Sequence, residues 1–173
     1  DQVKSIKSGD SVYISGIIYA ARDAAHKKLI ELINSGKELP FDIRGQIIYY
    51  VGPTPAPPGK VIGSAGPTTS GRMDAYAPTL IERGLKGMIG KGARSDKVKE
   101  YCRKHGAVYF AATGGAGALI ARTITAAEVV AYEELGAEAI RKLTVNRLPV
   151  VVINDTHGGD LYIEGRKKYS RTS

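Results

Sequence analysis

Hydroxyl and cationic side chains crowd into one short stretch of the chain, GPTTSGRMD at residues 66–74. Thr68, Thr69 and the serine after them offer three hydroxyls, and Arg72 adds a guanidinium. An arginine makes two parallel hydrogen bonds to a carboxylate or a phosphate, and a glycine such as Gly66 lets backbone N–H groups approach the same anion. The stretch is no P-loop, because no Lys-Ser or Lys-Thr pair follows the second glycine. It predicts an anion-binding loop.

Two further cations occupy positions that a bound anion would explain. Arg22 falls in the first turn of an expected helix, where a cation opposes the helix macrodipole. Lys91 stands between glycines in IGKGARS, with little apolar surface nearby for its stem. Each also fits an ordinary solvated surface residue. If Arg22, Arg72 and Lys91 converge, they form a pocket for two carboxylates, although a phosphate would fit as well.

The other residues with reactive side chains suggest an incomplete site. The three histidines lack metal-ligand spacing, so no metal site is expected. His26 follows Arg22 by one turn and either lines the same pocket or lies on the surface. Cys102 reads as a buried helix residue, because no histidine is placed to activate it. The glycine run TGGAG at 113–117 resembles a dinucleotide fingerprint only loosely, and close packing explains it equally well. The pattern indicates half of an active site.

The elements that must position these residues alternate between strand-like and helix-like runs. Ser95 and Gly106 bound one helix as N-cap and C-terminal glycine, and Pro78 marks a kink or a late start in another. The PTPAPPG segment at residues 53–59, the proline run, is predicted to be a rigid loop that supports the fold or contacts a partner. Alternation predicts an α/β fold with a mixed sheet and flanking helices, its working loops at the carboxyl ends of strands. The expected strands are 11–17, 45–52, 60–66, 86–92, 107–117, 139–145, 149–154 and 160–164, and the expected helices are 20–37, 73–84, 95–106 and 125–136.

Composition bounds the function. The 173 residues predict a single domain over 1–165, followed by a basic C-terminal tail over 166–173. With 25 Lys and Arg against 17 Asp and Glu, the net charge is +8, which suits an acidic partner, a small anionic substrate or nucleic acid. A nucleic-acid-binding domain needs a clustered basic face or a stacking platform, and only the tail is dense in charge. One cysteine and no apolar span of membrane length predict a cytoplasmic protein.

Five sequence blocks, in this order, closely resemble the β subunit, or C-terminal domain, of class I fumarate hydratases and the related L-tartrate dehydratase β subunit. The resemblance covers nearly the whole chain, from about residue 9 to about residue 165. It implies a swivelling β/β/α fold and a hetero-oligomer with an α subunit that carries a [4Fe–4S] cluster. The blocks are AARDAAHKK (20–28), YYVGPTPAPPG (49–59), GSAGPTTSGRMD (63–74), GKGARS (90–95) and ATGGAGAL (112–119).

The resemblance also implies roles for individual residues. Arg22, Arg72 and Lys91 would bind the carboxylates of a C4 dicarboxylate, with Thr69 and Gly66 beside them. Thr68, or Thr69 in its place, would be the hydroxyl that takes the C3 proton of malate, while the cluster acts as a Lewis acid on the leaving hydroxyl. A threonine serves as a base only where neighbouring cations stabilise the alkoxide.

The implied activity is reversible hydration of fumarate to (S)-malate, by an enzyme that works only with its α subunit. L-Tartrate dehydration is the closest alternative, because one extra hydroxyl is recognised by one or two side chains. A non-catalytic subunit that only orders its partner, or a basic nucleic-acid-binding domain, remains a more distant reading.

Overall fold

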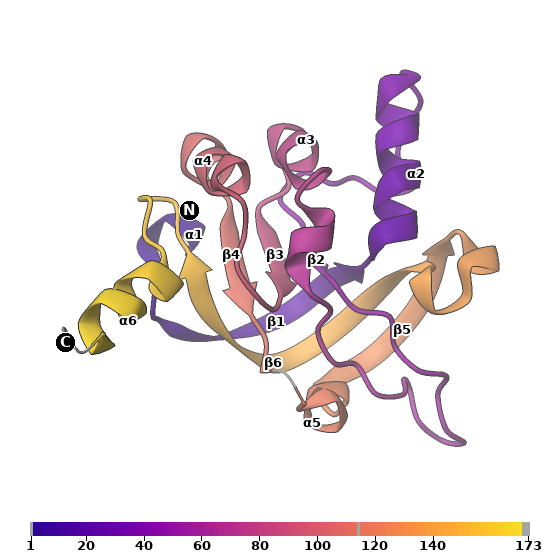
Figure 1. Cartoon of the computed structure of the whole chain (residues 1–173). Coiled ribbons are helices and arrows are strands. Elements are labelled where there is room, and N and C mark those ends of the chain that lie inside the picture. Colours follow the sequence, from indigo (N-terminus) through magenta and orange to yellow (C-terminus); the bar gives the residue numbers. More distant parts are fainter. Residues whose placement is uncertain (1, 114, 171–173) are drawn as a thin grey trace.

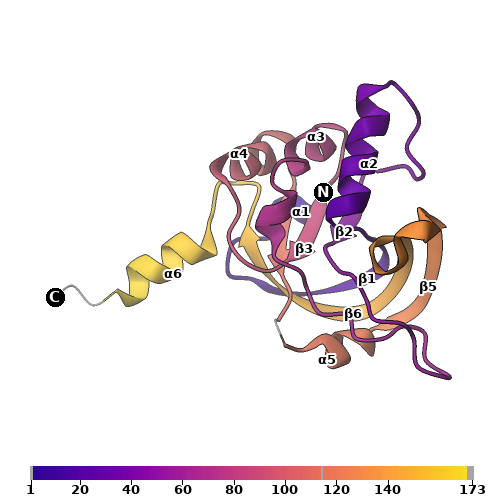
Figure 2. The same cartoon turned by 45° about the vertical axis from the view of Figure 1, so that its right-hand side comes forward.

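The computed structural model describes residues 2–113 and 115–170 (Figure 1). Within them a six-stranded mixed sheet runs in the order β1-β2-β3-β4-β6-β5, and β1 also pairs with β6. Strands β1 to β4 are parallel, whereas β6 is antiparallel to β1, β4 and β5. The pairings among β1, β2, β3, β4 and β6 therefore close a ring, and Figure 2 shows the sheet curling accordingly. The strands are β1 (Ser11–Ala20), β2 (Ile47–Tyr49), β3 (Gly87–Gly90), β4 (Val108–Ala111), β5 (Ile124–Ala131) and β6 (Ile140–Asn154).

Helices flank this sheet on both sides. Helices α2, α3 and α4 lie together on one side, and the short α5 lies on the other (Figure 1). None of the helices in the described part of the chain is long and apolar enough to cross a membrane. The α-helices are α1 (Gln2–Ser5), α2 (Asp23–Asn34), α3 (Ala77–Glu82), α4 (Asp96–His105), α5 (Gly117–Ala121) and α6 (Leu161–Tyr169), and the 3₁₀ helices are η1 (Ser70–Met73) and η2 (Glu133–Glu138).

Two apolar clusters form the core, one on each face of the strands. Consecutive residues of β3 show why: Met88 belongs to the cluster under α2, α3 and α4, and Ile89 belongs to the cluster enclosed by the curled sheet. The same alternation in β2 separates Ile48 from Tyr49. Strand side chains point alternately to opposite faces, so an apolar run buries both of them.

The predicted α/β class with a mixed sheet is confirmed, as are several local signals. The Ser95 side chain accepts the N–H of Val98 at the start of α4, and Gly106 ends that helix at φ 67°. Pro78 stands in the first turn of α3, so the helix starts late rather than kinking. A proline is tolerated there because the first N–H groups of a helix have no partner within it.

Three predicted elements are wrong. Residues 60–66 form a loop rather than a strand, tied to the proline run by the Thr54–Ser64 and Gly63–Thr54 backbone hydrogen bonds. Residues 125–136 lie mainly in β5, because pairing with β6 overrides the helical propensity of their alanines and glutamates. The expected strand 160–164 opens α6 instead, since the Asp160 carboxylate caps its first turn.

The expected strands 139–145 and 149–154 are one long strand, β6. It continues through Arg147, which has φ 55°, and the register against β1 shifts opposite that point. The basic residues Arg166, Lys167 and Lys168 of the predicted tail belong to α6, so the expected boundary at 165/166 falls inside a helix. Arg171 in that tail and Gly114 in the TGGAG run lie outside the described residues.

Candidate functional site

The loop at residues 66–74, called the threonine loop from here on, runs beside the carboxyl end of β3. The Thr68 N–H donates to the carbonyl of Tyr50 over 2.8 Å, and the Lys91 N–H donates to the carbonyl of Thr68 over 3.3 Å. The Ser70 N–H in turn donates to the carbonyl of Lys91 over 2.9 Å, so Thr69 and Lys91 pair as in a short parallel bridge. This close approach needs Gly90, because a Cβ there would overlap the Ser70 hydroxyl. The loop therefore holds both threonines next to Lys91.

Arg22 and Arg72 approach each other through a shared acid that sequence reasoning missed. Arg22 is the residue before α2, two positions after the end of β1, rather than part of the first turn of the helix. Its Nε lies 3.9 Å from Oδ1 of Asp23, whose Oδ2 lies 3.7 Å from Nη1 of Arg72. A second acid, Glu138 from η2, also stands 3.9 Å from Arg22 Nε. The two arginines thus flank one carboxylate at the carboxyl edge of the sheet.

These contacts form two groups joined by a single short segment. Thr68, Thr69 and Lys91 form one group through backbone hydrogen bonds, and Arg22 with Arg72 forms the other through Asp23. Residues 68–72 carry the threonines at one end and Arg72 at the other. The structure thereby brings Arg22 to one end of this segment, through Asp23 and Arg72, and Lys91 to the other end.

Buried polar atoms without partners concentrate at this point. Among the described residues, five such side-chain atoms occur, and three belong to the start of α2: Arg22 Nε, Asp23 Oδ1 and His26 Nε2. Buried polar groups are normally hydrogen-bonded, so a cluster of exceptions marks a place where a ligand or partner completes the structure. The contacts of 3.9 Å around Arg22 are ion contacts but exceed hydrogen-bond length.

His26 lies beneath the site rather than lining it. Its side chain is fully buried, one ring nitrogen, Nδ1, lies 2.8 Å from the Arg22 carbonyl, and the ring meets that of Tyr50 edge-on at 5.3 Å. Burial lowers the pKa of His26 to about 4, against the weaker opposing effect of the hydrogen bond to Arg22. A neutral imidazole therefore supports the backbone of Arg22.

A second ion pair stabilises the loop from below, and sequence reasoning missed it too. The guanidinium of Arg94 is fully buried and donates from Nε to Asp74 over 2.6 Å. The other carboxylate oxygen of Asp74 accepts the Ser95 N–H, and the Arg94 guanidinium also contacts the rings of Tyr50 and Tyr109. Asp74 and Arg94 lie in two of the sequence blocks that carry the family resemblance, but nothing in their spacing indicates that they pair. The pair ties the end of the threonine loop to the start of α4.

Gly66 of the threonine loop and Gly117 of the TGGAG run were both singled out in the sequence, and they lie close to each other. Gly66 lies against the backbone of Gly117, since a Cβ on Gly66 would stand 3.7 Å from the Gly117 Cα. A Cβ on Gly117 would overlap the Ser64 hydroxyl, so the TGGAG run ends in a close backbone approach. Packing is thus the observed role of Gly117, while substrate binding by Gly66 stays a prediction.

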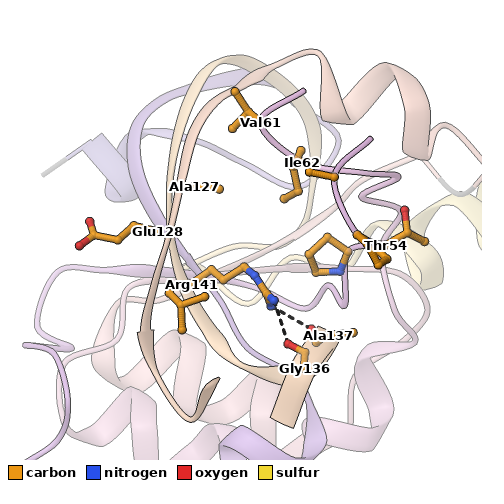
Figure 3. A pocket seen from close by; sticks show the side chains of 12 residues that line it. Thr54, Val61, Ile62, Ala127, Glu128, Gly136, Ala137 and Arg141 are labelled. Atoms are coloured by element: carbon orange, nitrogen blue, oxygen red, sulfur yellow. Dashed lines mark hydrogen bonds between the residues drawn. The ribbon is translucent and has the colours of Figure 1, made fainter. Parts of the chain in front are cut away.

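A hollow of about 330 Å³ opens around the side chain of Arg141 (Figure 3). The proline run forms one wall, and β5 with η2 forms the other. A Cβ on Gly52 would stand 2.7 Å from Arg22 Nη1 and 3.5 Å from the Ala137 carbonyl, so the arginine lies against the rim. Arg141 projects into the hollow and donates to the carbonyls of Gly136 and Ala137. The proline run therefore shapes a concave surface next to the predicted site.

The donors for a metal cluster are not assembled in this chain's described part. Within residues 2–113 and 115–170, no group of three or more His, Cys, Asp or Glu side chains is arranged to hold a metal ion. Cys102 is the chain's single cysteine, and it is fully buried in α4. Burial raises the pKa of its thiol to about 12, so it is a neutral core residue, as predicted.

Comparison with known proteins identifies the family. The family described as "Fumarase C-terminus" matches residues 1–165. The anaerobic class I fumarate hydratase of Escherichia coli (strain K12) is 46% identical over 151 residues, covering 86% of this chain and 28% of its own length. "Fumarate hydratase 2" of Leishmania major is 37% identical over 163 residues, covering 93% of this chain and 29% of its own length.

A relative from Methanocaldococcus jannaschii, provisionally named the L(+)-tartrate dehydratase subunit beta, is 40% identical over 172 residues. That match covers 96% of this chain and 88% of the relative. The chain thus spans less than a third of the two fumarate hydratases but nearly all of the β subunit. The loops that carry Arg22, Thr68, Arg72 and Lys91 lie within the matched range 1–165. The chain belongs to the fumarase C-terminus family.

Proposed function

We propose that this chain is the substrate-clamping half of an iron–sulfur hydro-lyase that interconverts fumarate and (S)-malate. It would act with an α-type partner that supplies the rest of the site and the [4Fe–4S] cluster. The proposal is supported by the relatives named fumarate hydratase and by a relative named as a β subunit. One observation carries it: Arg22 and Arg72 flank Asp23 beside the Thr68–Lys91 pair, with unpartnered buried atoms at that point.

The two arginines suit the two carboxylates of a C4 substrate. Arg72 is half exposed, at 52% of its side chain, and its contact with Asp23 is 3.7 Å long. Arg22 is more buried, at 24%, and has an unpartnered Nε. Bidentate hydrogen bonds to a substrate carboxylate would replace these long ion contacts with short ones. Binding both ends of the substrate fixes its C2–C3 bond against the threonine loop.

The proton transfer falls to a threonine hydroxyl. The backbone N–H and carbonyl of Thr68 are both engaged in the loop, while neither its hydroxyl nor that of Thr69 has a hydrogen-bond partner among the described residues. Oγ of Thr68, ionised to the alkoxide by release of its own proton to solvent, would accept the C3 proton of malate and so become the hydroxyl; in the reverse direction it would return that proton to fumarate. The ammonium of Lys91 and the guanidinium of Arg72 would stabilise the alkoxide and the developing carbanion.

The described residues of this chain do not fit an iron–sulfur cluster, since Cys102 is its single thiol and is buried. We therefore assign the cluster to the partner, where one open iron position would supply Lewis-acid assistance to the leaving hydroxyl. This chain's own residues bind and orient the dicarboxylate and hold the C3 proton.

L-Tartrate dehydration is the second candidate, for one specific reason. A relative that this chain covers over 88% of its length carries that name. The same carboxylate clamp would accept tartrate, and recognition of the additional hydroxyl needs only one or two polar groups.

The decisive experiment is anaerobic reconstitution with the α-type partner, following fumarate formation from (S)-malate and running L-tartrate in parallel. We expect malate turnover only when both halves are present. Arg72→Ala should lower kcat/KM by on the order of 100-fold with the complex intact, because a carboxylate clamp is lost. Arg83→Ala, which removes an exposed arginine at the end of α3, serves as the matched control and should leave turnover unchanged.

Each other outcome has a distinct meaning. Tartrate turnover without malate turnover would change the substrate and keep the clamp. Unchanged turnover in Arg72→Ala would contradict the site and favour a subunit that only orders its partner. A cluster-loaded complex that is inactive on both substrates would reject the dehydratase proposal.

A further inference from the structure

A hollow of about 460 Å³ lies at the opposite edge of the sheet from the candidate site. Its lining comes from four segments that are distant in sequence. They are α1, the residue before β3, the end of α4 and the turn after β6. Six of the eight lining residues are basic and none is acidic: Lys4, Lys86, Arg103, Lys104, His105, Gly106, Thr156 and His157. Such convergence is not produced by a single basic stretch of sequence.

The fold holds several of these groups in place. The Lys86 ammonium donates to the carbonyl of His105 over 2.5 Å, and the His157 ring nitrogen Nε2 lies 2.9 Å from the Lys4 carbonyl. The stem of Arg103 runs along the turn after β6, because a Cβ on Gly158 would stand 3.6 Å from its Cδ. Ordered cations lose less conformational entropy when they bind a ligand than flexible ones do.

Three of the cations in this hollow are not balanced by an acid among the described residues. Within the described part of the chain, Lys86, Arg103 and Lys104 have no carboxylate within ion-pair distance. The nearby Asp155 is occupied, since it accepts backbone N–H groups of Ser8, His157 and Gly159 at 2.8 Å each. Like charges gathered in a concave surface repel one another and attract anions.

The dipole of α4 explains only part of the positive charge that gathers in the hollow. Cations suit the carbonyl end of a helix, but that end carries roughly half an elementary charge. Lys86 already donates to the last helical carbonyl, that of His105. In addition, His105 Nε2 is buried and has no hydrogen-bond partner among the described residues. A buried donor or acceptor of this kind is normally satisfied by a ligand or an ordered water.

We propose that this hollow binds a small multivalent oxyanion, specifically a phosphate-bearing molecule. A phosphate group offers three acceptor oxygens and close to two negative charges, which matches convergent arginine, lysine and histidine donors. The hollow is bounded and concave, so it suits a small ligand rather than a nucleic-acid strand, which needs an extended groove. The site is separate from the carboxylate clamp and does not depend on the proposed hydro-lyase activity.

Calorimetric titration of the folded chain with pyrophosphate tests this, at a constant ionic strength of about 0.15 M to limit non-specific attraction. We expect saturable one-to-one binding with a Kd of about 1 mM or lower. Arg103→Gln removes an exposed cation of the hollow and should weaken binding about tenfold, as loss of one charge-assisted hydrogen bond implies. Lys97→Gln removes the same charge from an exposed position of the same helix and should change Kd less than about twofold.

Lys104→Gln provides a second test in the hollow, in case Arg103→Gln fails to fold by circular dichroism. Equal weakening by Lys97→Gln and the hollow variants would overturn the proposal, since net charge alone would then explain binding. Absence of saturation, or binding of a single-stranded oligonucleotide without binding of pyrophosphate, would overturn it as well. The second result would favour a nucleic-acid surface.

Discussion

The two edges of the parallel strands treat positive charge in opposite ways. At the carboxyl edge, Arg22 and Arg72 share Asp23, and Arg94 is buried against Asp74. At the amino edge, a hollow carries six basic residues and no acid. The first edge binds its arginines to acids, at contact lengths from 2.6 Å to 3.9 Å, whereas the hollow at the second edge has no acid in its lining. The difference separates arginines that acids hold in a fixed geometry from the basic residues Lys86, Arg103 and Lys104, which have no acid partner among the described residues.

At the carboxyl edge, the length of an ion contact distinguishes a pair that stabilises the fold from pairs that we propose a ligand replaces. The Arg94–Asp74 pair is short and buried, so it stabilises the fold. The Arg22 and Arg72 contacts are longer and more exposed, as the proposed exchange with a substrate carboxylate requires. The following changes test this division, beginning with the largest expected effect.

Asp74→Asn should break the structural pair. It leaves the fully buried Arg94 guanidinium without its carboxylate, and we expect the free energy of unfolding to fall by about 3–5 kcal/mol. Urea denaturation monitored by circular dichroism measures the change. Asp42→Asn is the matched control, because it disrupts an exposed pair with Arg44 and should leave stability unchanged. Equal effects of the two variants would show that burial does not distinguish the pairs.

Acid should destabilise the carboxyl edge through His26. Its pKa is about 4 in the folded chain and about 6.5 when unfolded, so the unfolded state binds the extra proton between those values. Stability from the neutral ring is therefore present above about pH 6.5 and falls by about 3 kcal/mol by pH 4. Urea denaturation across this pH range should give a flatter profile for His26→Gln than for the natural chain.

His157→Gln provides the control for that pH profile, since His157 lies in an exposed turn at the other edge. Its profile should follow that of the natural chain. If His26→Gln retains the full loss of stability towards pH 4, the effect originates in other groups and the buried neutral histidine is not its cause.

The smallest of the three effects is expected for Asp23→Asn. The change removes the charge that Arg22 and Arg72 share but keeps the size of the side chain. We expect KM for malate in the reconstituted complex to rise about tenfold with a smaller change in kcat, because the arginines lose their common anchor before substrate arrives. Steady-state kinetics separates the two parameters. A lower KM would instead show that Asp23 competes with the substrate for the arginines.

Local signals in the sequence predicted much of this edge, and tertiary contacts decided the rest. The capping of α4 by Ser95 and Gly106 depends on neighbouring residues and was predicted correctly. The assignment of residues 125–136 to a helix was wrong because β5 is determined by its pairing with β6. Arg22, Thr68, Arg72 and Lys91 were predicted as site residues from their unusual sequence positions and the family resemblance, and the structure places all four at this edge.

The acids that organise those cations could not be found in the same way. Glu138 contacts Arg22 across more than a hundred positions of sequence, and Asp74 meets Arg94 only once the threonine loop folds beside α4. An ordinary acid in an ordinary loop carries no local signal of its partner. The basic hollow was missed for the same reason, since its residues come from four separate segments.

The alternation of side chains along β6 has a consequence for how the chain unfolds. Ile140 and Ile153 belong to one apolar cluster, whereas Leu143, Val145 and Leu148 belong to the other. The same strand pairs with β1, β4 and β5. Neither core can therefore melt while the other persists, because each is one face of the same strands. The chain should behave as a single cooperative unit, in which the structure of both edges is lost together.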